Sequence, residues 1–195
     1  AEAGRTGARA PLPGGLTLRV GYGALVIGPA DDSAAEIGDD APALDPALSG
    51  LSFTAGETVE RSFGTWVFSA RPLHPDDDLP ALHADPLGAA LWVPAGATLA
   101  LRTRQAGDRF CPRGLGGHSQ KLADTLIAMR VPAPWRERVP LLTVNGVIAW
   151  FVAPTPEGVR GRVAEPFARP DLPEDSRTAV GVMVCWRRLT ALPRV

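Results

Sequence analysis

The chain has 195 residues, with 20 basic and 21 acidic side chains, a net charge of -1 and 45% hydrophobic residues. This composition excludes wholesale disorder, which needs low hydrophobicity and a high net charge, and the length fits one large domain or two small ones. Two cysteines and three histidines argue against a disulfide framework or a structural zinc site, so no metal is expected.

No apolar run approaches the roughly 18 residues of a membrane span, and the N-terminus lacks the basic and apolar segments of a signal peptide. We therefore expect a cytoplasmic chain with no membrane partner. Residue 1 is Ala, and the opening AEAGRTGARAPLPGG resembles a linker. From this we expect the chain to be an excerpt of a longer protein.

The first half of the chain is rich in β-type patterns and in acidic residues. Residues 16–20 alternate between apolar and polar and precede the apolar run 25–27, which predicts an N-terminal hairpin. A second β-rich segment covers residues 58–70. Residues 31–95 hold twelve acidic and two basic side chains, which we interpret as solvated loops rather than a cation site.

The second half reverses the charge, with eight basic and three acidic side chains in residues 99–145. The alternation of residues 99–103 predicts a strand that buries its leucines and presents Arg102 and Arg104 on the opposite face. We therefore expect a basic strand face in this region.

A helix is predicted over about residues 120–130, because Leu122 and Leu126 begin an apolar stripe at helical spacing. Either His118 or Ser119 is expected near its N-cap. The glycine-rich turn of residues 114–117 would then lie directly ahead of the helix.

Two later segments complete the expected fold. Asn145-Gly146 between two apolar runs predicts a tight hairpin, because both turn positions need positive φ. Residues 179–186 are apolar on both faces and predict a central or covered strand. We therefore expect an α+β fold of short antiparallel strands in one or two small sheets with few short helices. It would divide into a β-rich subdomain with acidic loops, residues 1–80, and a basic domain, residues 81–195.

Residues 101–142 are the strongest candidate for a binding site. They contain seven arginines and Lys121, the only lysine of the chain. Glycines allow backbone N–H groups to approach a phosphate, and arginines supply forked donors, so the segment resembles an anion site. Its GLGG turn matches neither a Walker A loop nor the dinucleotide fingerprint, which leaves a simple turn with solvated arginines as the alternative.

No residue of this segment is assigned a catalytic role. We interpret Asp108 as a turn-forming or ion-paired residue and Cys111 as an inert thiol without a placed base. His118 either contacts RNA or caps the helix. Trp135, among arginines and prolines, is expected to be exposed, where it would stack on a base or cover a domain boundary.

The segments LRTR, GDRFCPRG, GGHSQKLAD, VP and RERVPLL follow one another between residues 101 and 142. This ordered set closely resembles the C-terminal domain of tRNA(Ile)-lysidine synthetases. The sharp part of the likeness covers residues 99–152, and a looser part covers roughly residues 10–170. Gln120 and Ala123 stand where the family usually carries cations, so the predicted helix is less basic here.

The resemblance implies a noncatalytic portion of a ligase. Family members use ATP to join lysine to the anticodon cytidine of an isoleucine tRNA, in an N-terminal domain with a Ser-Gly-Gly-x-Asp-Ser loop that this sequence does not contain. We expect the chain to grip the tRNA acceptor stem, with no cofactor of its own and with ATP and Mg²⁺ in the parent's catalytic domain. The expected RNA contacts are Arg102, Arg104, Arg109, Arg113, Gly116, Gly117, His118, Lys121, Arg130, Arg136 and Arg138.

The partners implied are tRNA and the chain's own N-terminal catalytic domain. The alternative is a protein-docking or dimerisation module without nucleic-acid binding, in which the basic residues 99–145 meet the acidic residues 31–95 of the same or a second chain, as in a homodimer.

Overall fold

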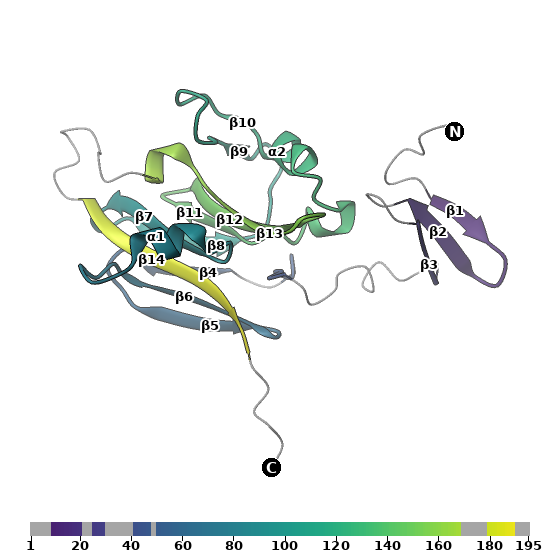
Figure 1. Cartoon of the computed structure of the whole chain (residues 1–195), viewed down its shortest axis with the longest axis horizontal. Helices are drawn as coiled ribbons and strands as arrows, with labels where there is room; N and C mark the ends of the chain where they lie inside the picture. Colours follow the sequence, from purple (N-terminus) through teal and green to yellow (C-terminus); the bar gives the residue numbers. More distant parts are fainter. Residues whose placement is uncertain (1–8, 21–24, 30–40, 48–49, 169–178, 190–195) are drawn as a thin grey trace, which may run out of the picture.

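The computed structural model describes residues 9–20, 25–29, 41–47, 50–168 and 179–189 (Figure 1). The strands are β1 (Arg9–Leu12), β2 (Leu16–Val20), β3 (Leu25–Pro29), β4 (Leu51–Thr54), β5 (Val59–Phe63), β6 (Trp66–Pro72), β7 (Gly88–Pro94), β8 (Thr98–Arg102), β9 (Arg109–Phe110), β10 (Gln120–Lys121), β11 (Leu141–Val144), β12 (Val147–Thr155), β13 (Gly158–Val163) and β14 (Ala179–Arg188). The helical elements are α1 (Leu79–Ala84), α2 (Leu122–Ala128) and the 3-10 turns η1 (Ala133–Trp135) and η2 (Glu165–Phe167).

The described part is mostly β, which corrects the expectation of an α+β fold with one or two sheets. Its strands form four antiparallel sheets, and its two α-helices have six and seven residues. The predicted helix over 120–130 begins only at Leu122, because Gln120 and Lys121 pair with β9. Among the described residues, no helix is long and apolar enough to cross a membrane.

Two of the sheets form a sandwich. One has five strands in the order β13-β12-β11-β8-β4, and the other has four in the order β5-β6-β14-β7. Phe53 of β4 and Phe68 of β6 meet between them with ring centroids 6.2 Å apart, and Phe68 also packs edge-on against Trp186 of β14. The sandwich core is therefore built from inward-facing aromatic and aliphatic side chains of both sheets.

A third layer, residues 103–140 between β8 and β11, covers the other face of the five-stranded sheet; we call it the cap layer (Figure 1). Phe110 of β9 packs against Phe151 of β12 with ring centroids 5.0 Å apart. Leu122 and Leu126 of α2 are fully buried, which is worth about 2 kcal/mol for each side chain. Covered on both faces, β12 reads as a continuous apolar run from Ile148 to Ala153 instead of alternating.

Several predicted strands are confirmed. The segment 58–70 forms the β5–β6 hairpin, and Asn145-Gly146 joins β11 to β12 with φ values of 48° and 85°. The apolar segment 179–186 lies inside β14, which runs between β6 and β7. The expectation of a central strand is therefore confirmed, while its burial alternates between buried residues such as Val182 and Val184 and half-buried ones such as Met183 and Cys185.

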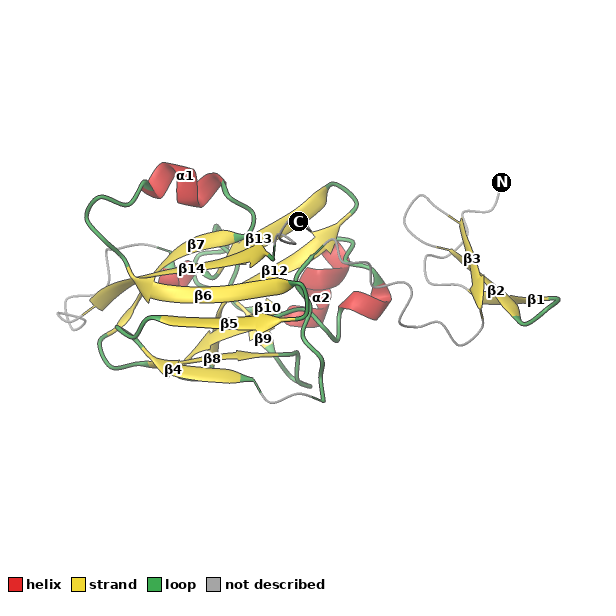
Figure 2. Ribbon diagram, turned by 90° about the horizontal axis from the view of Figure 1, so that it is seen from below, coloured by secondary structure: helices red, strands yellow, loops and turns green. Residues whose placement is uncertain are grey.

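The N-terminal hairpin is also present, as β2 and β3, with β1 added along β2. Figures 1 and 2 show this small sheet apart from the sandwich. The expected boundary near residue 80 does not coincide with a break in either sandwich sheet, because β4 pairs with β8 and β6 pairs with β14.

Candidate nucleic-acid interface

The hairpin of β9 and β10 places two cations side by side on the surface of the cap layer. Arg109 lies directly opposite Lys121, and Phe110 lies opposite Gln120. Successive side chains of a strand point to opposite faces, so the burial of Phe110 sends Arg109 to the solvent side. Both Arg109 and Lys121 are exposed. We call these two residues the cationic pair.

Like charges directly opposite each other weaken a strand pair, so the cationic pair is unfavourable for folding. Neither member forms an ion pair with a carboxylate of any described residue. Two hydrogen bonds to Ser119 hold Arg109 in place. The Nε of Arg109 donates to the Ser119 Oγ at 2.9 Å, and a terminal guanidinium nitrogen donates to the Ser119 carbonyl oxygen at 2.5 Å. The guanidinium is thus oriented, with further N–H groups left for an anion.

The loop between β9 and β10 continues this surface. Arg113, Gly116, Gly117 and His118 are all exposed. Gly116 and Gly117 have φ values of 59° and 82°, which favour glycine, and the backbone N–H of Gly117 donates to Glu165 at 3.2 Å. These glycines do not lead into a helix as expected, because β10 intervenes. The N-cap of α2 is Lys121, not His118 or Ser119, and its side chain makes no capping bond.

The expected basic strand face is instead used for internal ion pairs. Arg102 makes a bidentate pair with Asp108, with both N–O distances 2.8 Å, and Arg104 pairs with Glu137. Burial opposes ionisation of Asp108, but hydrogen bonds from Arg102 and the Gln105 N–H outweigh it and lower the pKa of this carboxyl. The ion-paired interpretation of Asp108 is confirmed. The Arg102–Asp108 pair anchors the cap layer to the end of β8, whereas the Arg104–Glu137 pair joins two parts of the cap layer itself.

The remaining predicted contacts lie in the segment after α2, which Figure 1 shows on the far side of α2 from the β9–β10 hairpin. Arg130 is exposed and has a left-handed φ of 58°. Arg136 is half-buried and donates from Nε to the Val131 carbonyl at 2.9 Å. Arg138 is half-buried in the same connection. Of these three, Arg130 is the most accessible to a ligand.

Two expectations about single residues have different outcomes. Trp135 is only 4% exposed, so the expectation that it is exposed was wrong. Burial, with a smaller contribution from the negative charge of Glu165, raises the pKa of Cys111. A raised pKa disfavours the thiolate, which agrees with an inert thiol.

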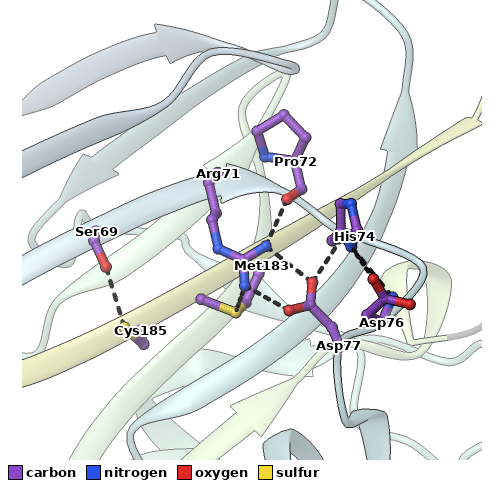
Figure 3. A network of polar contacts seen from close by, with 8 residues as sticks. All are labelled: Ser69, Arg71, Pro72, His74, Asp76, Asp77, Met183 and Cys185. Carbon is purple, nitrogen blue, oxygen red and sulfur yellow. Dashed lines mark hydrogen bonds and ion pairs between the residues drawn. The ribbon is translucent and has the colours of Figure 1, made fainter.

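The ion pairs described in residues 31–95 are made within that segment or with β14. In the acidic half, Arg71 donates to both carboxylate oxygens of Asp77 at 2.9 and 2.6 Å (Figure 3). This contact, joined by the His74 N–H, lowers the pKa of Asp77 to about 2. Arg71 is therefore neutralised inside the acidic half.

Sequence reasoning missed two residues of this surface. Ser119, which orients Arg109, lies inside the recognised motif but was considered only as a helix cap. Glu165, which accepts the Gly117 N–H, lies 48 positions further along the chain and has no local signal. The described residues contain no cluster of three or more His, Cys, Asp or Glu side chains that could hold a metal ion.

The fold and the hairpin define a small antiparallel β-sandwich domain whose cap layer carries exposed cations without described carboxylate partners. Residues 99–153, which span β8 to β12, match the family model described as the TilS substrate C-terminal domain. The chain therefore carries the C-terminal domain of the tRNA(Ile)-lysidine synthase family.

The chain is also similar to individual proteins. The tRNA(Ile)-lysidine synthase of Symbiobacterium thermophilum is 33% identical over 176 residues, which are 89% of this chain and 32% of that protein. The enzyme of the same name from Clostridium acetobutylicum is 39% identical over 57 residues, 29% of this chain and 12% of the relative. A crystal structure of a TILS C-terminal domain is 17% identical, with a TM-score of 0.47 over 73% of this chain and all of that one. The chain spans about a third of the Symbiobacterium relative.

Proposed function

We propose that this chain is the noncatalytic, tRNA-binding C-terminal portion of a tRNA(Ile)-lysidine synthase and that it grips the acceptor stem. The observation that carries the proposal is the cationic pair, in which Arg109 and Lys121 lie opposite each other without a described carboxylate partner. Such a pair costs folding free energy unless an anion occupies the space in front of it. Family membership makes a tRNA phosphate the best candidate for that anion.

The proposed interface is narrower than the set expected from sequence. It keeps the cationic pair and the exposed residues Arg113, Gly116, Gly117, His118 and Arg130. Arg102 and Arg104 are left out because carboxylates already neutralise them. Arg136 and Arg138 are left out because they are half-buried. An A-form stem exposes phosphates and 2'-hydroxyls rather than readable base edges in its major groove, and these suit exposed cations and backbone N–H groups.

ATP and Mg²⁺ enter this proposal only as ligands of the catalytic region of the whole enzyme. The sequence has no Ser-Gly-Gly-x-Asp-Ser loop, and the described residues offer no carboxylate cluster that fits Mg²⁺. We expect calorimetry with ATP and Mg²⁺ to show no binding to this chain alone. The work of the chain in this proposal is to hold cytoplasmic tRNA.

The experiment is a fluorescence anisotropy titration with three RNAs: an isoleucine tRNA, its acceptor-stem hairpin and its anticodon stem-loop. We expect the first two to bind with similar affinity and the third more weakly. With four phosphate contacts, affinity should fall roughly a hundredfold between 50 and 200 mM salt, using the duplex-DNA coefficient of about 0.9 per contact. Binding that ignores salt, or that favours the anticodon stem-loop, would contradict the proposal.

A docking role is the second candidate, and one observation favours it. The sheet of β1–β3 exposes aliphatic side chains on one face, with Leu25 at 67% and Ile27 at 60% exposure. Leu18 lies opposite Ile27 and so belongs to the same face. Gel filtration of an Ile27→Asp variant tests this role, since association through this face should disappear in the variant and persist at high salt in the original chain.

A further inference from the structure

In the described loop between β9 and β10, one backbone N–H, that of Gly117, donates a hydrogen bond to an acidic side chain. It donates to a carboxylate oxygen of Glu165 at 3.2 Å. A carboxylate oxygen on a backbone N–H is in the position that a phosphate oxygen takes in an anion site. The loop therefore already holds an anion, and that anion belongs to the protein.

Glu165 is fixed beside the loop by its own backbone. Its N–H donates to the carbonyl oxygen of Cys111 at 2.9 Å, and the preceding Ala164 forms a β-bridge with Pro112. The backbone of Glu165 therefore lies beside the first residues of the loop, and its carboxylate contacts Gly117 near the end of the loop. Its negative charge is also felt at the loop base, since it contributes to the raised pKa of Cys111.

The basic residues of the loop do not explain the contact between Glu165 and Gly117. Arg113 and His118 are exposed, yet neither forms an ion pair with Glu165 or with any other described carboxylate. The carboxylate is bonded to a neutral backbone group although the exposed guanidinium of Arg113 lies in the same loop. Ion pairing within the protein is therefore not what positions it.

We propose that Gly117 is a phosphate-binding position for RNA and that Glu165 occupies this position until a phosphate oxygen displaces it. The inference rests on the proposed function and adds a selectivity residue to it. The Glu165 carboxylate disfavours any weakly bound anion for two reasons. Its negative charge repels the incoming anion, and its hydrogen bond with the Gly117 N–H must break before the anion can bind. A polyanion that also engages Arg109 and Lys121 gains enough from those contacts to displace it.

The first test compares Glu165→Gln with the original chain, using the acceptor-stem hairpin as the probe. Gln keeps an oxygen that can accept the Gly117 N–H but removes the charge. We expect RNA to bind about three- to tenfold tighter, the range given by loss of one repulsive charge at about 6 Å for effective dielectric constants between about 80 and 40. Glu60→Gln is the matched control, since Glu60 lies on β5, in the sheet away from the cap layer, and pairs with Arg187; its affinity should change less than twofold.

A second variant separates competition from simple anchoring. If Glu165 only held the loop in shape, Glu165→Ala would loosen the loop and weaken RNA binding, and Glu165→Gln would leave it unchanged. Under the proposal both variants bind more tightly. The Gly117 amide resonance should also shift at lower inorganic phosphate concentration in Glu165→Gln than in the original chain.

The possible failures can be distinguished. If no form of the chain binds RNA, the proposed function is wrong. If the original chain binds RNA with the expected salt dependence but the Gln and Ala variants bind equally or less well, the function stands and the role of Glu165 is overturned. An unchanged Gly117 resonance of the Glu165→Gln variant in phosphate would overturn the position itself.

Discussion

The β9–β10 hairpin and the four-stranded sheet both expose arginines, but they differ in what those arginines meet. On the four-stranded sheet, Arg187 is 51% exposed and still pairs with Glu60, and Arg71 pairs with Asp77. On the hairpin, Arg109 has Lys121 opposite it and no described carboxylate partner. Exposure alone therefore does not mark a binding surface.

The difference teaches that a cation is informative when the fold leaves its charge uncompensated. Elsewhere in the basic half, Arg102 at the end of β8 and Arg104 in the cap layer have carboxylate partners and serve as anchors, whereas the cationic pair has none described. Substitutions that remove one charge at a time can test this division between anchoring and ligand-facing cations.

The largest effect is expected from breaking an anchor. Asp108→Ala should lower the free energy of unfolding by about 3 kcal/mol, because it leaves the largely buried Arg102 without its bidentate partner and removes an acceptor for the Gln105 N–H. Urea denaturation measures this. Glu157→Ala, which breaks the exposed pair with Arg160, should cost less than about 0.5 kcal/mol. Equal losses in the two variants would contradict the anchoring role.

The next effect concerns RNA affinity. The double variant Arg109→Ala/Lys121→Ala should bind the acceptor-stem hairpin about tenfold more weakly in low salt, and the log–log salt slope should become shallower by about 2, as expected for two lost phosphate contacts. Anisotropy titrations at several salt concentrations measure both quantities. The control Arg160→Ala/Arg187→Ala removes the same charge from carboxylate-paired arginines, and a comparable loss there would show that only net charge matters.

A pH dependence is expected on the four-stranded sheet. Hydrogen bonds from Arg71 and the His74 N–H lower the pKa of Asp77 from its usual 3.8 to about 2 in the folded chain. Its contribution to stability is therefore present above about pH 4 and is lost as the pH falls towards 2. Denaturation of Asp77→Asn should show a flatter stability profile in this window than the original chain. Parallel profiles would mean that the contact is not formed in solution.

The smallest effect has the opposite sign. Lys121→Gln should raise the free energy of unfolding by about 0.3 kcal/mol, because it removes the like charge opposite Arg109. The same variant should bind RNA more weakly. Thermal denaturation combined with anisotropy checks both, and a variant that is less stable would show that the cationic pair does not repel.

Local signals predicted much of the fold. Asn145-Gly146 predicted a hairpin because few turn types require positive φ at two successive residues. The segment 179–186, which is apolar on both faces, predicted a central strand. The overall class was misjudged towards helix, because the apolar spacing that begins at Leu122 does not reveal that Gln120 and Lys121 are taken by β9.

The candidate site was predicted in composition but not in arrangement. Its cations were found from the ordered motif, yet the partners of Arg102 and Arg104 depend on how the cap layer folds back on the sheet. Trp135 was judged by its polar neighbours, although Val131 and Val139, four positions away on either side, are buried with it. That spacing was the available signal. Glu165 had none, because only the tertiary fold brings it to Gly117.

The position of the cap layer in the chain has a consequence for how this surface can diversify. Arg102 at the end of β8 lies directly opposite Leu141 at the start of β11, so residues 103–140 leave and re-enter the scaffold at adjacent points. Insertions or deletions between Arg113 and His118 would change the exposed surface of the cap layer without removing any strand pairing of the sandwich. This requires that Phe110 and Leu122 still cover the five-stranded sheet. A change in the length of this loop would therefore alter the proposed RNA-facing surface, Gly117 included, and leave the two sandwich sheets intact.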